Sequence, residues 1–568
     1  MPQRIVIVGG VACGPKAAAR ARRLDPDARI TIIEKGETLS YAGCGIPYFL
    51  SGDVKEASGL TETPLGIARD TDFFMTLKDI TVLNRTLAES IDRDNKIVHV
   101  VNVADGSRSR IPYDKLVLAT GGQPFLLDIP GRDSVNNVFT LCSHACVEDA
   151  VKIDRALVEG KLKNAVVIGG GLIGLEITES LVRRGLSVTI VEMMDRILPG
   201  LLDAEMSVYL TRHLIQKGVG VMTGTTVTRI TGDGRGNVVS VVTDKGEVPA
   251  DFVLVAVGMK PNSKLAKDSG IEIGQLGGIL IDEEMKTSDP DIYAGGDCVE
   301  QMGLVHGRRV TIPMGSTANK HGRVIGTNVT GGSERFKGVC GTAIVKVFDY
   351  TAAATGLSEA AAKKAGFVVQ TVLSPSPDKA HYYPGAQTIV IKLVADAGSR
   401  RLLGAQIIGP GDVDKRVDVA AVALGFGATV DQAADFDLAY APPYSSAMDN
   451  IITAANIMRN KLDGIAKGVT PMQVMERITR GDGFVLLDVR TASEITTDGQ
   501  LPSGNVVHIP LGKLRERAGD LPKNTEIITF CKVSLRGYEA AKILEGLGFT
   551  DVKFMDGGIV TWPYDMVK

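Results

Sequence analysis

The chain has 568 residues, which at roughly 100–200 residues per domain predicts three to five domains. Its 63 Lys and Arg residues nearly balance its 66 Asp and Glu residues. The resulting formal net charge of −3 argues against a general affinity for nucleic acid or anionic lipid. A single Trp and 5% aromatic residues argue against carbohydrate-stacking surfaces and membrane aromatic belts. The first residues show no charged leader region and no apolar run approaches about 18 residues, so we expect a soluble cytoplasmic protein.

The seven cysteines are an odd number without a CxxC pair. This pattern is typical of a reducing compartment, where each cysteine either packs as a small apolar residue or takes part in chemistry. Cys13, Cys298 and Cys340 are predicted to pack. Cys142 and Cys146 are four residues apart, but no third ligand accompanies them, and we predict no metal site.

Residues 4–34 follow the order strand, glycine turn, helix, strand and acid. The turn spans residues 9–14, and Glu34 closes the second strand 20 residues after Gly14. Glycines let the backbone approach a pyrophosphate, the helix N-terminus attracts it, and Glu34 can accept ribose hydroxyls. Val11 stands where the fingerprint has its second glycine. The pattern predicts a dinucleotide site; a βαβ unit with an incidental glycine turn is the alternative.

A second copy of this pattern occupies residues 165–192. It contains all three fingerprint glycines, Gly169, Gly171 and Gly174, and Glu192 again closes the second strand. An acid at this position favours an unphosphorylated ribose, so NADH is predicted to be preferred to NADPH. Two nucleotide folds in one chain indicate a hydride donor and a second dinucleotide, for which a flavin is the best candidate.

Further segments point to the flavin. Residues 116–122 and 252–258 are matching strand-to-turn segments, and residues 287–297 deliver Asp297 beside two glycines, where its carboxylate can accept hydrogen bonds from a ribityl chain. Over about residues 1–450 the sequence resembles the pyridine nucleotide–disulfide oxidoreductase superfamily. The resemblance implies an α/β fold with two Rossmann-like domains, and a flavin unit split by the NAD unit.

The implied organisation has six parts. They are an FAD-binding domain (1–150, first part), an NAD-binding domain (151–270), the second part of the FAD-binding domain (271–330), an α+β dimerisation domain (331–458), a linker (459–469) and a separate C-terminal α/β domain (470–568). The predicted FAD contacts are Gly9, Gly10, Ala12, Gly14, Glu34, Lys35, Ala119, Thr120, Gly121, Asp297, Gly315, Ser316 and Thr317. The predicted NAD contacts are Gly169, Gly171, Ile173, Gly174, Glu192 and Gly258.

Cys44 lies ten residues after the first acid, between two glycines. Many relatives carry a CxxxxC pair here, whereas Gly43 and Phe49 occupy the alternative positions in this chain. A single thiolate must form its mixed disulfide, persulfide or sulfenate with an external partner. A buried packing cysteine is the alternative interpretation.

Two tyrosine segments, residues 381–385 and 439–445, together with the lone cysteine, resemble the coenzyme A disulfide reductases. By that resemblance, tyrosines from a partner subunit of a homodimer hydrogen-bond near the active cysteine. Tyr383 and Tyr440 are the predicted acids or thiolate stabilisers, because a phenol is protonated at neutral pH. Tyrosines packed at a dimer interface are the alternative.

Coenzyme A carries phosphates, so its site needs cations. Lys16, Arg20 and Arg23 recur at helical spacing on one face; a solvated basic face is the alternative. The resemblance implies coenzyme A contacts at Lys16, Arg20, Arg23, Ser40, Gly43, Tyr382 and Tyr444.

The last hundred residues resemble a rhodanese domain. Residues 531–536 form a loop between a strand and a helix, and its successive N–H groups can hold an anionic persulfide. Cys531 and Arg536 occupy the expected catalytic positions, while Ser534 stands where many rhodaneses have glycine. A purely structural rhodanese fold is the alternative.

These features together predict an FAD enzyme that uses NAD(P)H to reduce coenzyme A persulfide, polysulfide or coenzyme A disulfide through Cys44, while Cys531 handles sulfane sulfur. The fusion to a rhodanese favours persulfide or polysulfide. An NADH oxidase or peroxidase that uses a cysteine sulfenate is the first alternative, and a redox-sensing sulfur carrier with little turnover is the second.

Overall fold

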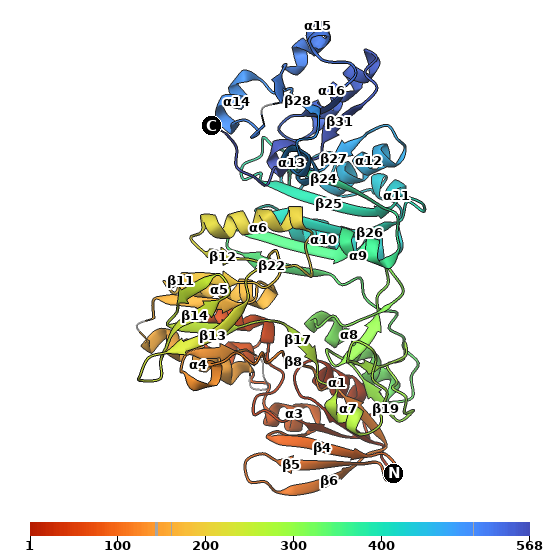
Figure 1. Cartoon of the computed structure of the whole chain (residues 1–568). Helices are drawn as coiled ribbons and strands as arrows, with labels where there is room; N and C mark the ends of the chain where they lie inside the picture. The colour runs from red at the N-terminus through yellow and green to blue at the C-terminus, as the bar shows by residue number, and fades with distance from the viewer. Residues whose placement is uncertain (142–145, 161, 504, 568) are drawn as a thin grey trace. The chain divides into compact units, whose positions relative to one another are not determined.

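A computed structural model describes residues 1–141, 146–160, 162–503 and 505–567. The chain divides into two compact units (Figure 1). Unit 1 comprises Met1–Asp195 and Ile215–Val339, and unit 2 comprises Arg196–Leu214 and Cys340–Lys568. Among the described residues, no helix is long and apolar enough to cross a membrane.

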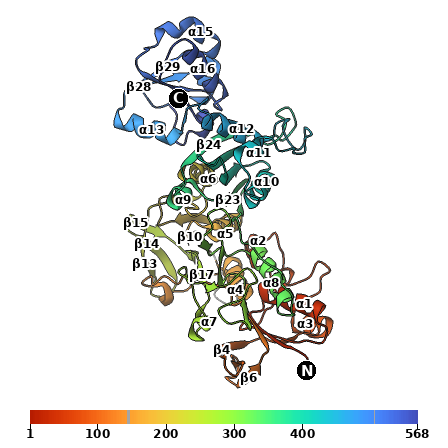
Figure 2. The same cartoon turned by 90° about the vertical axis from the view of Figure 1, so that its right-hand side faces the viewer.

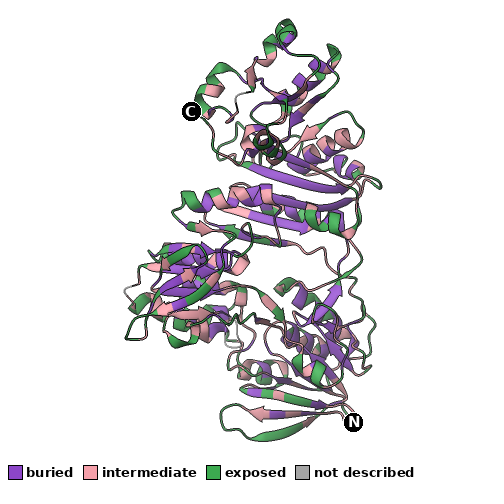
Figure 3. Cartoon of the chain, in the orientation of Figure 1, coloured by how far each residue is buried: buried purple, intermediate pink, exposed green. Residues whose placement is uncertain are grey.

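The first sheet of unit 1 is parallel, with the strand order β19-β7-β1-β2-β3. Its strands are β1 (Arg4–Val8), β2 (Arg29–Ile33), β3 (Thr81–Leu83), β7 (Lys115–Leu118) and β19 (Ile292–Ala294). The strands β1, β7 and β19 are buried on both faces apart from the first residues of β1 and β7, as parallel strands covered by helices require (Figure 3). Because β19 pairs with β7, residues from both sides of the inserted segment share one sheet.

The second sheet of unit 1 is also parallel, with the order β12-β11-β10-β16-β9. Its strands are β9 (Val138–Thr140), β10 (Asn164–Ile168), β11 (Ser187–Val191), β12 (Gly220–Met222) and β16 (Phe252–Val255). The three-residue β9 joins this sheet although it precedes the predicted start of the NAD unit at residue 151. No turn motif in the sequence marks so short a strand.

Helices and smaller sheets complete unit 1. The helices are α1 (Cys13–Leu24), α2 (Ile46–Ser51), α3 (Thr71–Lys78), α4 (Cys146–Glu159), α5 (Leu172–Arg183), α7 (Lys264–Asp268) and α8 (Gly315–Asn328). The minor strands are β4 (Thr86–Asp92), β5 (Ile97–Asn102), β6 (Arg108–Pro112), β8 (Gly122–Pro124), β13 (Val227–Gly232), β14 (Val238–Thr243), β15 (Gly246–Pro249), β17 (Met259–Pro261), β18 (Ile279–Leu280), β20 (Val299–Met302) and β21 (Arg309–Val310). Helices α1 and α8 pack closely, which glycines at positions 322 and 326 of α8 allow. A Cβ added at Gly322 or Gly326 would lie 2.5 Å from a carbonyl oxygen of α1.

Unit 2 contains an antiparallel sheet with the order β22-β23-β26-β25-β24. Its strands are β22 (Ala343–Val347), β23 (Tyr350–Gly356), β24 (Val369–Pro377), β25 (Thr388–Asp396) and β26 (Leu402–Gly409). The associated helices are α9 (Glu359–Ala365), α10 (Val413–Gly425), α11 (Val430–Ala434) and α12 (Asn450–Leu462).

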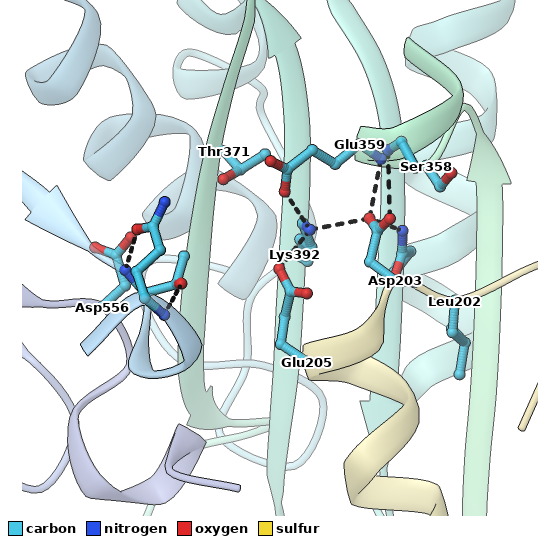
Figure 4. Close-up of polar contacts among 12 residues, drawn as sticks. Leu202, Asp203, Glu205, Ser358, Glu359, Thr371, Lys392 and Asp556 are labelled. Atoms are coloured by element: carbon cyan, nitrogen blue, oxygen red, sulfur yellow. Dashed lines mark hydrogen bonds and ion pairs between the residues drawn. The ribbon is translucent and has the colours of Figure 1, made fainter. Parts of the chain in front are cut away.

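Helix α6 (Ala204–Gln216) lies beside this sheet and begins within the predicted NAD domain (Figure 1). Lys392 of β25 is fully buried, and its Nζ lies 2.5 Å from Glu205, 2.7 Å from Glu359 and 2.9 Å from Asp203 (Figure 4). Breaking a buried ion pair by removing one partner is costly, so this cluster holds the start of α6 on the sheet. Residues 196–214 therefore leave the contiguous NAD unit expected at 151–270.

The C-terminal sheet of unit 2 is parallel, with the order β27-β31-β30-β28-β29. Figure 2 labels its strands β28 and β29. Its strands are β27 (Gly468–Val469), β28 (Phe484–Asp488), β29 (Val506–His508), β30 (Glu526–Phe530) and β31 (Val552–Met555), and its helices are α13 (Pro471–Arg480), α14 (Ala492–Asp498), α15 (Leu514–Arg517) and α16 (Leu535–Gly546). Because α12 extends to Leu462 and β27 pairs with β31, residues 463–467 separate the two elements, a shorter connection than the predicted linker 459–469.

Candidate active sites

In the first glycine turn of unit 1, the backbone at Gly9 and Gly14 packs directly against other backbone atoms. Gly9 has φ +118°, and a Cβ there would lie 2.1 Å from the carbonyl oxygen of Ala119. A Cβ at Gly14 would lie 1.9 Å from the carbonyl oxygen of Gly9. No other residue fits at Gly9 without displacing the turn or the segment that follows β7, nor at Gly14 without displacing the turn or α1. Ala12 immediately precedes α1. Further along the same sheet edge, Gly121 has φ +69° and open space around its Cα.

The two acids have matching surroundings. One carboxylate oxygen of Glu34 accepts the N–H of Gly10 at 2.7 Å and the other accepts that of Gly36 at 2.7 Å. In the second copy, Glu192 accepts the N–H of Gly170 at 2.7 Å and that of Met194 at 2.8 Å. Each carboxylate oxygen retains a lone pair for a further donor. The fixed carboxylates therefore suit paired hydroxyls such as those of a ribose.

The second glycine turn shows the same crowding. A Cβ at Gly169 would lie 2.4 Å from the oxygen of Ala256, and one at Gly174 would lie 2.1 Å from the oxygen of Gly169. Gly171, directly before α5, has no atom within 4 Å of the added Cβ. The turn thus packs tightly against backbone at Gly169 and Gly174 and has open space at Gly171, as a turn that receives a pyrophosphate requires. Ile173 lies in the first turn of α5 and Gly258 is exposed with φ +105°.

Asp297 follows β19 and lies beside the start of α8. Burial raises the pKa of this carboxyl to about 6, although the backbone N–H of Met314 donates to it. Gly315 and Ser316 are exposed in the first turn of α8, and an added Cβ at Gly315 would meet open space. A largely buried carboxylate beside a helix N-terminus provides an acceptor for hydroxyls and donors for an anion, so these residues fit a flavin with its ribityl chain.

Cys44 occupies the short 3-10 turn Gly43–Gly45 that leads into α2, and its thiol is free and exposed. Sequence reasoning missed two neighbours of this turn. Burial, Glu176 and Cys44 are among the causes that raise the pKa of Tyr48, and burial together with Glu179 raises the pKa of Glu176 to about 7. The position of Glu176 in the fingerprint helix is visible in the sequence, but its approach to α2 is set by tertiary packing. The Ser180 hydroxyl, for example, donates to the carbonyl of Pro47 at 2.8 Å.

The predicted basic face of α1 contains one side chain with a structural partner. Lys16 and Arg23 are exposed, whereas the Nε of Arg20 donates to the Thr327 hydroxyl at 3.1 Å. The N–H of Ser40, which has φ +45°, donates to the carbonyl of Gly10 at 2.8 Å. This bond places the segment before Cys44 next to the glycine turn. Lys35 and Gly43 lie in the same connection, exposed and half-buried respectively.

The predicted tyrosines lie on unit 2 and are exposed in the single chain. The exposed fractions are 67% for Tyr382, 39% for Tyr383, 52% for Tyr440 and 66% for Tyr444. Tyr382 and Tyr440 come from the two separate segments and share a side-chain hydrogen bond. The fold therefore brings the 381–385 and 439–445 segments together.

Cys531 follows β30 and is fully buried, and Arg536 lies in the first turn of α16. The Arg536 guanidinium binds both carboxylate oxygens of Glu494 and also contacts the Cys531 sulfur. This pairing lowers the pKa of Glu494 to about 2. Ser534 adopts φ +85°, in the region that favours glycine, and its hydroxyl donates to the carbonyl of Met555 at 3.1 Å. The serine thus retains the backbone turn that glycine would give.

The other cysteines are spread over the fold. Cys13 and Cys298 are free and buried, and the half-buried Cys340 thiol contacts the carbonyl of Ala421. Cys146 is disulfide-bonded, which departs from the reduced thiols that the cysteine pattern led us to expect. Cys142 lies outside the described residues.

Family models and solved structures match this chain over most of its length. The pyridine nucleotide-disulphide oxidoreductase model matches residues 3–314, its dimerisation domain matches 342–452 and the rhodanese-like domain matches 470–564. The structure of a NAD-dependent persulfide reductase from A. fulgidus is 47% identical with a TM-score of 0.92, covering 99% of this chain and 100% of that one.

Two further relatives agree. The NAD(P)H coenzyme A polysulfide/persulfide reductase of Pyrococcus horikoshii is 37% identical over 462 residues, which is 81% of this chain and 99% of the relative. The structure of reduced Bacillus anthracis CoADR-RHD is 34% identical with a TM-score of 0.92, covering 99% of this chain and 98% of that one. The chain therefore belongs to the pyridine nucleotide-disulphide oxidoreductase family.

Proposed function

We propose that this protein is an NADH-preferring flavoenzyme that reduces coenzyme A persulfide, polysulfide or coenzyme A disulfide through Cys44. Its family makes it an enzyme that uses FAD and NAD(P)H. The observation that carries the proposal is Cys44 itself: of the free cysteines among the described residues, it is the exposed one, and it follows the first glycine turn and its acid. The relatives named as persulfide and polysulfide reductases support the substrate class.

Separate sets of residues in unit 1 would bind the two nucleotides. When bound, FAD supplies a two-electron carrier between the nicotinamide donor and the substrate sulfur. Glu34 and Asp297 would accept hydroxyls of this group, with Lys35, Ala119 and Thr120 along its path. Thr317 and its neighbours in the first turn of α8 would offer N–H donors. Glu192 would hold the ribose of the nicotinamide donor.

Cys44 would act as a nucleophile. Its thiolate attacks one sulfur of the substrate, forming a Cys44–sulfur bond and breaking the S–S bond of the substrate. One thiolate or hydrosulfide leaves and takes a proton. The Cys44 adduct is two electrons more oxidised than the thiolate, so the two electrons of one NADH restore the enzyme and release the second sulfur species.

A partner subunit would complete this site. The chain carries the dimerisation domain of its family, and the exposed tyrosines that the fold brings together support a homodimer in which Tyr383 and Tyr440 of one subunit reach Cys44 of the other. Protonated phenols there would donate to the leaving sulfur. Lys16 and Arg23 would bind the phosphates of coenzyme A, with Ser40, Gly43, Tyr382 and Tyr444 along its groove. We further propose that the enzyme is cytoplasmic, where coenzyme A and NADH are available.

Cys531 would carry a sulfane sulfur as a persulfide. The Arg536 guanidinium lies against its sulfur and is itself held by Glu494, so a cation is fixed beside the anionic terminus of a persulfide. The same thiol would either donate sulfur to the reductase site or accept it from there.

NADH consumption by the flavin-loaded enzyme tests the proposal. Coenzyme A persulfide, coenzyme A disulfide, polysulfide and peroxide are tested anaerobically, oxygen is tested in a separate aerobic arm, and the variants are Cys44→Ser and Cys531→Ser. We expect sulfur substrates to be reduced, Cys44→Ser to abolish reduction and Cys531→Ser to retain it. Strong activity only with oxygen or peroxide would instead support the oxidase alternative, and turnover that survives Cys44→Ser would refute the proposal.

A further inference from the structure

A short segment after β31 forms one wall of the Cys531 loop. The N–H of Ile559 donates to the carbonyl of Cys531 at 3.0 Å, and the N–H of Val560 donates to the carbonyl of Lys532 at 3.1 Å. Gly558, with φ +60°, allows this approach, because a Cβ there would lie 2.4 Å from the Cys531 oxygen. We refer to residues 556–562 as the wall segment.

The wall segment fixes the direction of two peptide groups in the loop. In a trans peptide the C=O and the N–H of the same unit point in opposite directions. The Cys531 carbonyl points to the wall, so the N–H of Lys532 points away from it; the Lys532 carbonyl likewise turns the N–H of Val533 away. Successive N–H groups directed to one side of a loop form an anion-binding concavity. The wall hydrogen bonds therefore orient donors for an anionic persulfide.

The other side of the wall segment is bound by α6, far from it in sequence. The Tyr209 hydroxyl donates to the carbonyl of Val560 at 3.1 Å and also hydrogen-bonds with the Thr561 side chain. Arg212, on the same helix, donates to the carbonyl of Trp562 at 3.1 Å. Val560 therefore links the two sides of the wall segment, because its carbonyl accepts from the Tyr209 hydroxyl and its N–H donates to the Lys532 carbonyl.

The start of the wall segment is bound by α12. Lys461 and Asp556 are 4% and 2% exposed, and the Lys461 Nζ lies 2.5 Å from a carboxylate oxygen of Asp556. The same ammonium donates to the carbonyl of Thr371 in β24 at 2.9 Å, and both Asp556 and Thr371 appear in Figure 4. A buried ion pair of this kind holds the wall segment to the dimerisation sheet.

We propose that Tyr209, Arg212 and Lys461 are positioning residues for sulfur transfer at Cys531. They lie outside the rhodanese domain and act through the wall segment on the direction of the loop N–H groups. This inference rests on the proposed function of Cys531. It makes the sulfur loop of this chain dependent on α6 and α12, so the rhodanese domain works as an integrated part of unit 2.

The test uses the full-length flavin-loaded enzyme with thiosulfate and cyanide as probes. Cys531 thiolate takes the outer sulfur of thiosulfate and releases sulfite; cyanide then removes that sulfur as thiocyanate and regenerates the thiolate. Tyr209→Phe keeps the ring and removes the hydroxyl with its hydrogen bonds to the Val560 carbonyl and the Thr561 side chain, so we expect kcat/KM for thiosulfate to fall about 3- to 10-fold. The double variant Tyr209→Phe/Arg212→Met should lose more. The matched control is Tyr564→Phe, which removes a hydroxyl beside the Trp562 ring.

Two readouts separate positioning from loss of structure. The acidic limb of the pH profile of kcat/KM should move to higher pH in Tyr209→Phe, because misdirected N–H groups stabilise the thiolate less. NADH-dependent sulfur reduction through Cys44 should stay at the wild-type level. Lys461→Met should lower sulfur transfer and Lys461→Arg should restore part of it.

The outcomes distinguish two failures. Thiocyanate formation that survives Cys531→Ser would contradict the proposed function of Cys531. Activity that requires Cys531 but is equal in Tyr209→Phe and Tyr564→Phe, with unchanged pH profiles, would overturn the positioning role alone.

Discussion

Replacing Glu192 with Gln tests the nucleotide assignment with minimal change in shape. Both carboxylate oxygens accept backbone N–H groups, from Gly170 at 2.7 Å and Met194 at 2.8 Å. An amide has one acceptor oxygen, so its NH₂ group must face one of these donors. An unsatisfied buried N–H costs about 1–3 kcal/mol, which predicts a lower thermal midpoint.

The same substitution should weaken NADH binding. A hydrogen bond to a charged acceptor contributes about 1.5–3 kcal/mol, so the loss of one ribose hydrogen bond lowers kcat/KM for NADH roughly 10- to 100-fold. Removing the negative charge should also favour the 2′-phosphate of NADPH, so the ratio of kcat/KM for NADH to kcat/KM for NADPH should fall. Steady-state kinetics with both nucleotides measure this, and Glu159→Gln at the exposed end of α4 is the control. An unchanged ratio, with kcat/KM for NADH equal to that of the control, would refute the assignment.

Three further substitutions and one control test the fold and its charges. Lys392→Met should lower the free energy of unfolding by about 3–5 kcal/mol. Lys513→Met, which removes one partner of an exposed pair with Glu516 outside the cluster, should lower it by less than about 1 kcal/mol; similar losses in chemical denaturation would contradict the buried cluster. The pKa of Glu176 is raised to about 7 in the folded protein. As pH rises from about 4.5, the carboxyl loses its proton in the unfolded chain before it does so in the folded protein, so the stability of the fold falls until about pH 7. Glu176→Gln should therefore raise the thermal midpoint at pH 8 more than at pH 5, and an equal change at both would contradict the shift. Gly14→Ala places a Cβ 1.9 Å from the Gly9 oxygen and should remove most bound flavin; normal flavin absorbance would contradict the close packing.

The glycine turns and their acids could be predicted because their constraints are local. Gly14 and Gly174 are required by contacts within one strand–turn–helix unit, with the carbonyl oxygens of Gly9 and Gly169. Gly9 and Gly169 themselves face backbone from distant segments, at Ala119 and Ala256, but both belong to a local motif that marks them in the sequence. The same holds for the loop that begins at Cys531, which lies between adjacent elements of one βα unit. The α/β fold class was confirmed for the same reason.

The parts that could not be predicted depend on partners distant in sequence. The departure of α6 from the NAD unit is fixed by Lys392, which lies 187 residues from Glu205. The wall segment depends on Tyr209, 351 residues before Val560, and on Lys461, 95 residues before Asp556. Hydrophobic periodicity and turn motifs report neighbours along the chain, and they carry no signal for a buried lysine and its distant carboxylates.

The central claim is that one thiol, Cys44, receives the substrate sulfur. Its most direct test is the amount of sulfide released per NADH consumed, measured anaerobically with coenzyme A persulfide and the flavin-loaded enzyme. The account predicts one sulfide for each NADH in the wild type and no sulfide above background in Cys44→Ser, which should still bind flavin. Sulfide release at the wild-type rate by Cys44→Ser would contradict it.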